Sequence, residues 1–253
     1  MSSADAGPAR AYARYALALL ALGNLINYLD RNIIYALFEP IRRDLGVSDT
    51  QLGWLGSAYA IVFSLGALSA GVLSDLVSRR AVLAGSIALW SSVTALGGLV
   101  RSFWQLFASR AVVGLGQSAY LPAAQALLAD YFPTKGRAQA MGIFWVGLAL
   151  GGVLAVYLGG ILATAFGWRS TLMIVGLPGL LFALLLARLK DPAERATPMA
   201  ARRPAPKFRI TWRVAIRTVM PLLVSLALAT AVWGFLALFR NLPADADTAA
   251  FGI

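Results

Sequence analysis

Long apolar runs separated by short polar breaks are the dominant pattern of this chain. Seven such runs occur, and each is long enough to cross a hydrocarbon layer, which takes about 20 apolar residues. They cover residues 13–38, 51–74, 81–100, 104–127, 138–164, 169–188 and 215–239. Because backbone polar groups inside a membrane must bond within their own segment, the pattern predicts helices rather than open strands. The expected fold class is therefore all-α and integral to a membrane.

The runs also divide the chain into parts. We expect a short cytoplasmic tail at 1–12, a six-helix domain at 13–188, a basic cytoplasmic linker at 189–214, and a seventh helix within 215–253. The linker is rich in Pro, Ala and Arg, a composition typical of a flexible connection. GVLSDLVSRR after the second run and GILATAFGWR after the fifth share their Gly-x-Leu start and their tenth-place Arg. This similarity favours two three-helix repeats of inverted topology inside the six-helix domain.

Composition supports a membrane protein and excludes several kinds of active site. Hydrophobic residues make up 59% of the chain and charged residues 13%, against about 25% charged residues in an ordinary soluble domain. The chain contains no His and no Cys. Metal sites built on imidazole or thiolate, and Ser-His-Asp or Cys-His catalysis, are therefore excluded. We expect neither an enzyme nor a cofactor.

The net charge of +11 is explained by where the basic residues lie. With the N-terminus in the cytoplasm, 15 Lys and Arg fall on the inner side of the membrane and 5 on the outer side. Such an excess inside is the usual orientation signal of membrane proteins. The basic charge therefore does not indicate nucleic acid binding. It predicts a multi-pass protein of the plasma (inner) membrane with a cytoplasmic N-terminus.

Three charged residues, Asp30, Arg31 and Arg110, lie inside the predicted spans. A charge at the centre of a span costs about 2.5–3.5 kcal/mol, so such groups normally face a partner or a watery cavity. From the rise of a helix, Asp30 and Arg110 both lie about 8–9 Å inside the outer edge of the hydrocarbon layer. Our hypothesis is that Asp30 faces Arg110 and leaves Arg31 in a polar cavity. The alternative is a structural network that does not touch substrate.

Further polar residues share the faces of these two spans. They are Asn24, Asn27, Tyr28, Arg31 and Tyr35 on the first span and Arg110 and Gln117 on the fourth. Their helical spacing predicts a continuous polar lining on each helix. A substrate pathway between the spans is one interpretation. A packed polar interface inside a bundle is the other.

These residues lie within motifs of a known family. GVLSDLVSRR, with Gly71, Asp75, Arg79 and Arg80, is similar to the conserved loop after the second helix of major facilitator superfamily transporters. LFASRAVVGLGQSA resembles the fourth-helix motif of that family, and DYFPTKGRAQAMG, with Asp130 and Arg137, resembles the loop before the fifth helix. The chain thus resembles the N-terminal half of such a transporter. The resemblance implies a helical bundle of six helices in two inverted three-helix repeats, followed by the seventh helix.

Two finer resemblances bear on the substrate. NYLDR and FWQL are similar to spinster-like members, which implies proton-coupled movement of an amphiphilic, lipid-like molecule with Asp30 and Arg110 in the coupling. NYLDR also resembles the anion:cation symporter group, which implies organic anions such as sugar acids. Spinster-like proteins often carry Glu where this chain has Gln117. Asp30 is then the sole titratable carboxylate in these spans.

The resemblance implies a secondary active transporter, a symporter or an antiporter, that moves an organic anion or an amphiphilic small molecule. Its expected partners are the lipid bilayer, a small-molecule substrate and protons. The family builds its pathway between two six-helix halves. This chain is therefore expected to need its missing C-terminal half or a second copy. The alternative function is a truncated, non-transporting half-unit that packs against a partner.

Overall fold

The computed structural model describes residues 6–76, 78–132 and 134–189. Its helices are α1 (Ala6–Ala36), α2 (Phe38–Leu45), α3 (Asp49–Leu76), α4 (Arg79–Gly97), α5 (Phe103–Ser118), α6 (Tyr120–Tyr131) and α7 (Thr134–Ala187). Within these residues there is no strand, which confirms the all-α prediction. The predicted seventh helix and all of the predicted linker beyond Leu189 lie outside the described residues.

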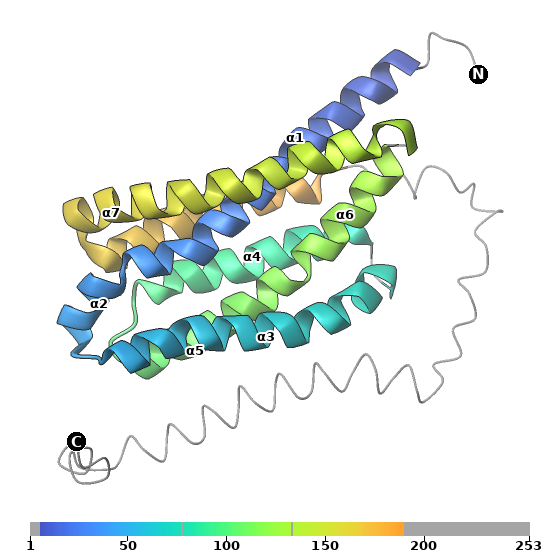
Figure 1. The fold of residues 1–253 in the computed structure, drawn as a ribbon. Helices are drawn as coiled ribbons and strands as arrows, with labels where there is room; N and C mark the ends of the chain where they lie inside the picture. Colours follow the sequence, from blue (N-terminus) through green and yellow to red (C-terminus); the bar gives the residue numbers. More distant parts are fainter. Residues whose placement is uncertain (1–5, 77, 133, 190–253) are drawn as a thin grey trace, which may run out of the picture.

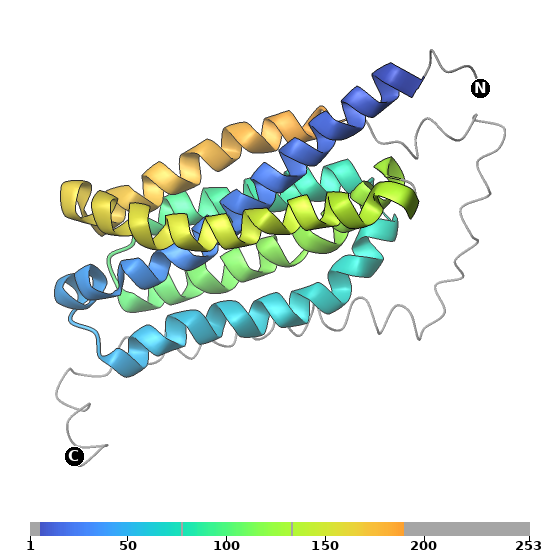
Figure 2. The ribbon, with the colours of Figure 1, turned by 45° about the horizontal axis from the view of Figure 1, so that its top comes forward.

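The long helices lie side by side as a bundle (Figures 1 and 2). α1 starts at one end, which we call the N-terminal end, and α2 lies at the opposite end. α3 returns to the N-terminal end, α4 runs back, and α5 with α6 returns again (Figure 1). The fourth predicted span is therefore formed by α5 and α6 together.

α7 reverses direction within its length. Its 54 residues would extend about 81 Å as a straight helix, far more than one hydrocarbon layer of about 30 Å. Gly167 has a φ of +78°, in the left-handed region that glycine adopts without steric cost. In Figure 1 one arm of α7 runs to the opposite end and the other returns beside it. The two arms, 134–166 and 168–187, correspond to the fifth and sixth predicted spans.

The structure breaks the fourth span at Ala119, where the sequence analysis expected one helix over 104–127. Pro122 explains the break, because proline lacks the N–H that would bond to the carbonyl of Ser118, four residues earlier. α5 accordingly ends at Ser118 and α6 starts at Tyr120. Of the predicted site residues on this span, Arg110 and Gln117 lie on α5, and Asp130 lies on α6.

Two further differences concern the first span. α1 begins at Ala6, seven residues before the expected start, and Pro8 lies in its first turn, where a missing N–H breaks no helical bond. The helix also ends at Ala36, and a separate helix α2 follows. In α2, Ile41 is buried while Arg42 and Arg43 remain exposed. α2 is therefore a short amphipathic helix at the opposite end of the bundle.

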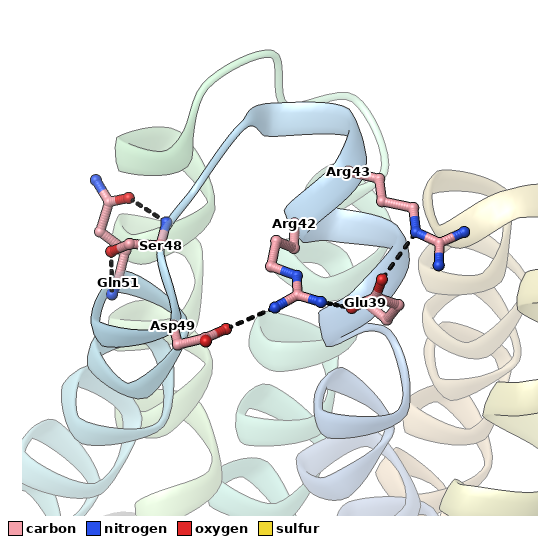
Figure 3. A network of polar contacts seen from close by, with 6 residues as sticks. All are labelled: Glu39, Arg42, Arg43, Ser48, Asp49 and Gln51. Carbon is pink, nitrogen blue, oxygen red and sulfur yellow. Dashed lines mark hydrogen bonds and ion pairs between the residues drawn. The ribbon is translucent and has the colours of Figure 1, made fainter.

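Ion pairs tie α2 to the start of α3 at the molecular surface (Figure 3). Glu39 pairs with Arg42 at 2.5 Å and with Arg43 at 2.8 Å, and Arg42 also pairs with Asp49 at 3.1 Å. Ser48 and Gln51 exchange hydrogen bonds beside this group. The hydrogen bond from Arg43 is the largest influence on the pKa of Glu39, which is lowered from its ordinary value. We call Glu39, Arg42, Arg43 and Asp49 the surface network.

Glycines bring the helices of the bundle into close contact. A Cβ atom on Gly151 would lie 2.5 Å from the carbonyl oxygen of Leu25 on α1, and one on Gly114 would lie 2.6 Å from that of Tyr59 on α3. A Cβ on Gly176 would similarly lie 2.6 Å from the backbone nitrogen of Ala95 on α4. Small residues that allow backbones to approach are typical of membrane helix interfaces. These contacts hold each arm of α7 and the middle of α5 against a neighbouring helix.

The apolar surface of the bundle fits a membrane. Three stretches, Asp49–Leu68, Arg79–Gly97 and Gly136–Ala187, have the length and hydropathy needed to cross one. Many large apolar side chains remain exposed on α7, among them Val153, Tyr157, Leu181 and Leu184. Apolar exposure on this scale is unusual for a soluble monomer.

Candidate functional site

Asp30 of α1 lies in the interior of the bundle, only 2% exposed. Its Oδ2 atom accepts a hydrogen bond from the hydroxyl of Thr94 on α4 and another from the side-chain amide of Gln117 on α5, both at 3.0 Å. Its Oδ1 atom is buried and has no hydrogen-bond partner. One carboxylate oxygen is therefore held by two donors while the other remains available.

Arg110 of α5 is linked to Asp30 through Thr94. The guanidinium donates to the Thr94 hydroxyl at 3.4 Å, and that hydroxyl in turn donates to Asp30. Arg110 is 1% exposed, and its Nε atom has no hydrogen-bond partner. The sequence hypothesis had Asp30 facing Arg110 directly. The structure corrects this, because Thr94 of α4 lies between the two charges. The sequence indicated only that Asp30 and Arg110 lie at a similar depth in the membrane, and depth does not show which side chain separates them.

Gln117 connects three helices around the carboxylate. Its amide nitrogen donates to Asp30 and, at 3.4 Å, to the carbonyl oxygen of Asn27 on α1. Its amide oxygen accepts a hydrogen bond of 2.8 Å from the hydroxyl of Tyr59 on α3. Gln117 is itself buried. A neutral amide at this position therefore fixes the orientation of Asp30.

The predicted polar lining of α1 divides into two parts. Asn24 and Asn27 are buried together with Asp30. Asn24 donates to the carbonyl oxygen of Phe144 on α7 at 2.9 Å, while its Oδ1 atom and the Nδ2 atom of Asn27 have no partner. Tyr28, Arg31 and Tyr35 instead border an open hollow. The polar residues predicted to form one lining on α1 thus divide into a buried group around Asp30 and a second group beside the hollow.

Arg31 lies among aromatic rings. Its guanidinium carbon is 5.6 Å from the centre of the Tyr28 ring, 5.0 Å from that of Tyr59 and 5.4 Å from that of Phe63. Distances of this size allow cation–π attraction. The polar cavity expected around Arg31 is therefore partly an aromatic one. α3 contributes Tyr59 and Phe63, which the sequence analysis did not identify.

The hollow beside Arg31 has a volume of about 600 Å³ and lies between α1 and the first arm of α7. The α1 wall presents Tyr28, Arg31, Asn32 and Tyr35, and the α7 wall presents Leu148, Ala149, Gly152 and Val153. One wall is thus polar and cationic and the other is apolar. This arrangement can hold an anionic group that is joined to an apolar one. We call it the Arg31 hollow.

The loop-motif residues gather at the N-terminal end. Arg79 forms an ion pair with Asp130 and donates to the carbonyl oxygen of Ala126 at 3.3 Å. These contacts join the start of α4 to the last turns of α6. Arg80 follows in the first turn of α4 and is half-buried.

Arg137 donates to the carbonyl oxygens of Ala129 at 2.8 Å and Phe132 at 3.4 Å. It thereby caps the end of α6 from the start of α7. Gly71 and Asp75 lie on the last turns of α3, outside the residues whose side chains the structure describes.

Comparison with known proteins gives the family. The sequence profile described as the Major Facilitator Superfamily matches residues 20–249. Over 181 residues, 71% of this chain, an "MFS-type efflux pump" of Mycolicibacterium smegmatis is 35% identical, with 42% of that protein covered. The sphingosine-1-phosphate transporter SPNS2 of Mus musculus is 31% identical, with 70% of this chain and 33% of that protein covered. These relatives are transporters, not enzymes.

The fold comparison agrees. The crystal structure of a bacterial homologue of the human lysosomal transporter Spinster, inward-facing and occupied, is similar with a TM-score of 0.67 and 31% sequence identity. The similarity covers 72% of this chain and 45% of that one. The chain therefore spans less than half the length of these relatives, and the expected resemblance to spinster-like proteins is confirmed. The chain is an integral membrane protein that belongs to the Major Facilitator Superfamily, in which it corresponds to the N-terminal half of a spinster-like transporter.

Proposed function

We propose that this half forms part of the pathway of a proton-coupled secondary active transporter, and that Asp30 is the group that takes up and releases the proton. The observation that carries the proposal is the unequal bonding of the two carboxylate oxygens. Oδ2 accepts two hydrogen bonds, whereas Oδ1 is buried without a partner. A proton on Oδ1 leaves both existing hydrogen bonds in place.

Protonation also changes the charge balance of the interior. The Asp30 carboxylate and the Arg110 guanidinium offset each other across Thr94. When Asp30 is neutral, the positive charge of Arg110 is no longer offset, and Arg31 adds a second positive charge nearby. Proton binding therefore increases the affinity of the pathway for an anion. A change that favours one of two conformations in this way is what a coupled transporter requires.

The favoured substrate is an organic anion or an anionic amphiphile. In the Arg31 hollow, Arg31 would attract the anionic group while Leu148 and Val153 contact an apolar part. The relatives include a probable L-galactonate transporter of Escherichia coli and the sphingosine-1-phosphate transporter SPNS2, whose names describe an organic anion and an anionic lipid. Because the binding of the anion and the binding of the proton favour each other here, we expect the two to move in the same direction, as in a symporter.

Placement in the plasma membrane with a cytoplasmic N-terminus completes the proposal. It is supported by the excess of Lys and Arg that the positive-inside rule assigns to the N-terminal side of the spans. Transport itself is expected only when a second six-helix half closes the pathway, since the family rocks one half against the other.

The test is uptake into proteoliposomes that contain this half together with a second six-helix half, which we call the full-length protein. Uptake is driven by an inward proton gradient. Radiolabelled galactonate, galacturonate and sphingosine-1-phosphate serve as probes. Asp30→Asn is expected to abolish the dependence on the gradient and to retain exchange of labelled for unlabelled substrate. Asp44→Asn, which changes an aspartate paired with Arg169 on the surface, is the matched control. Gradient-driven uptake that persists unchanged in Asp30→Asn would remove Asp30 from the mechanism.

A second candidate function is a non-transporting half-unit that packs against a partner. The large apolar side chains that remain exposed on α7 favour it. It predicts that the 253-residue chain inserts correctly in vesicles and shows no uptake of any of the three probes. Uptake by this chain alone would exclude the second candidate.

A further inference from the structure

A second hollow lies at the N-terminal end of the bundle, away from Asp30. Its volume is about 910 Å³, and it is bordered by the first turns of α1, the end of α6 and the start of α7. Arg10 and Arg14 lie on its α1 side. Apolar side chains, including Leu17, Phe132 and Ile143, form the rest of its wall together with Gln139. We call it the Arg10/Arg14 hollow.

The two arginines are available to a ligand. They are one helical turn apart and therefore lie on the same face of α1, and both are exposed. In the described part of the chain, neither forms an ion pair or a side-chain hydrogen bond, and no acidic residue borders the hollow. Arg79 and Arg137, at the same end, are by contrast occupied by Asp130 and by backbone carbonyls. Among the described residues, the hollow therefore joins a positive charge that no acidic side chain offsets to an apolar wall.

The length of α1 places this charge at the level of lipid headgroups. Its 31 residues rise about 46 Å, some 16 Å more than the hydrocarbon core of a bilayer. Because the charged helix α2 follows α1 directly at the opposite end, the excess length falls at the N-terminal end. Arg10 and Arg14 lie within the first about 12 Å of the helix. They are thus beside the bilayer surface rather than in its core.

From these observations we propose that the Arg10/Arg14 hollow binds the headgroup of an anionic phospholipid. The two guanidinium groups contact the phosphate, and the apolar wall contacts the start of the acyl chains. Basic pockets between membrane helices recognise anionic headgroups through this combination. The apolar wall favours a lipid over a free anion. The proposal is independent of the transport mechanism, since it involves none of the residues around Asp30.

The chain's own linker is a poor alternative occupant. Nine Lys and Arg lie between Arg188 and Arg217, and only Asp191 and Glu194 are acidic in that segment. A segment with this balance of charge is repelled by Arg10 and Arg14. Charge complementarity therefore favours an external anion.

The test measures lipid retention by the full-length protein. The purified, delipidated protein is titrated with palmitoyl-oleoyl phosphatidylglycerol or phosphatidylcholine, and bound lipids are counted by native mass spectrometry. The wild type is expected to retain phosphatidylglycerol in preference to phosphatidylcholine. The double variant Arg10→Gln/Arg14→Gln is expected to bind phosphatidylglycerol about tenfold more weakly, because each basic residue near a membrane surface adds to the attraction.

Three controls make the result decisive. Arg43→Gln/Arg101→Gln removes the same charge at the opposite end and is expected to change binding less than twofold. Arg10→Lys/Arg14→Lys keeps the charge and is expected to keep most of the binding, because Lys and Arg near the surface contribute similarly to the attraction for anionic lipid. Ala18→Trp fills the hollow without changing charge and is expected to weaken binding.

Two results would overturn the proposal. One is equal weakening by the two Gln double variants, which would indicate a diffuse effect of net charge. The other is displacement of phosphatidylglycerol by inorganic phosphate beyond that caused by chloride of the same ionic strength, which would indicate a site for free anions.

Discussion

The two polar networks of this bundle contrast sharply. The surface network contains formal ion pairs of 2.5–3.1 Å, but the side chains of Glu39 and Arg42 are 47% and 44% exposed. The interior network around Asp30 has hydrogen bonds of 2.8–3.4 Å, no formal ion pair among its described residues and no exposed member. Water screens the first network and is excluded from the second. Burial, rather than the number or shortness of ion pairs, therefore decides which network matters for stability and function.

The largest expected effect is that of Arg110→Met. Removing one partner of a buried charged group leaves the other uncompensated, so the free energy of unfolding is expected to fall by about 3–5 kcal/mol. Denaturant titration of the full-length protein in detergent measures it. Arg42→Met, in the surface network, is expected to cost at most about 1 kcal/mol. Equal losses in the two variants would contradict the comparison.

A double variant sharpens this first prediction. Asp30→Asn/Arg110→Met removes both charges, so it is expected to be more stable than Arg110→Met alone. A double variant that is less stable than Arg110→Met would show that the two charges do not compensate each other through Thr94.

Thr94→Val is expected to have the next largest effect. Valine has nearly the shape of threonine but lacks the hydroxyl that joins Asp30 to Arg110. The loss of a buried hydrogen-bonding group is expected to cost about 1–3 kcal/mol of stability and to reduce uptake driven by a proton gradient about tenfold. Thr94→Ser keeps the hydroxyl and serves as the control. If Ser and Val behave alike, the hydroxyl has no part in the coupling.

Tyr59→Phe isolates a single neutral hydrogen bond of the interior network. It removes the bond to Gln117, so a loss of about 1 kcal/mol is expected, while the ring beside Arg31 is retained. Tyr28→Phe also keeps a ring beside Arg31 but removes no bond to Gln117. Thermal unfolding of the two variants side by side measures the difference. A larger loss in Tyr28→Phe would be inconsistent with the assigned role of Tyr59.

Glu39→Gln is expected to have the smallest effect. Because its pKa is lowered in the folded protein, Glu39 stabilises the fold at neutral pH, and this contribution disappears as the pH falls through the lowered pKa. The difference in melting temperature between wild type and Glu39→Gln is therefore expected to be small at pH 7 and to shrink toward pH 3. A difference that grows in acid would have the wrong sign.

The sequence predicted the parts of this structure that carry strong signals. Long apolar runs revealed the helices, and Asp30 and Arg110 stood out because charge is rare in a span. Thr94, Tyr59 and Phe63 could not be identified in this way, because hydroxyl and aromatic side chains are common in membrane helices and cost little there. Which helix lies between two others depends on packing. The position of Thr94 between Asp30 and Arg110 therefore could not be predicted from the sequence either. Pro122 is the exception, because a proline inside a helical run is itself a sequence signal for a break such as the one at Ala119.

The break between α5 and α6 has a mechanical consequence. With no hydrogen bond from Pro122 to Ser118, bending at this point disrupts less of the helix than bending elsewhere. Gln117 lies on one side of the break, and Asp130, which holds Arg79, lies on the other. If α6, which carries Asp130, tilts, the chain can bend at Ala119 and leave the hydrogen bond between Gln117 and Asp30 unchanged. The fourth span is thus two helices joined at a hinge, so the N-terminal end can rearrange while the Asp30 carboxylate keeps its geometry.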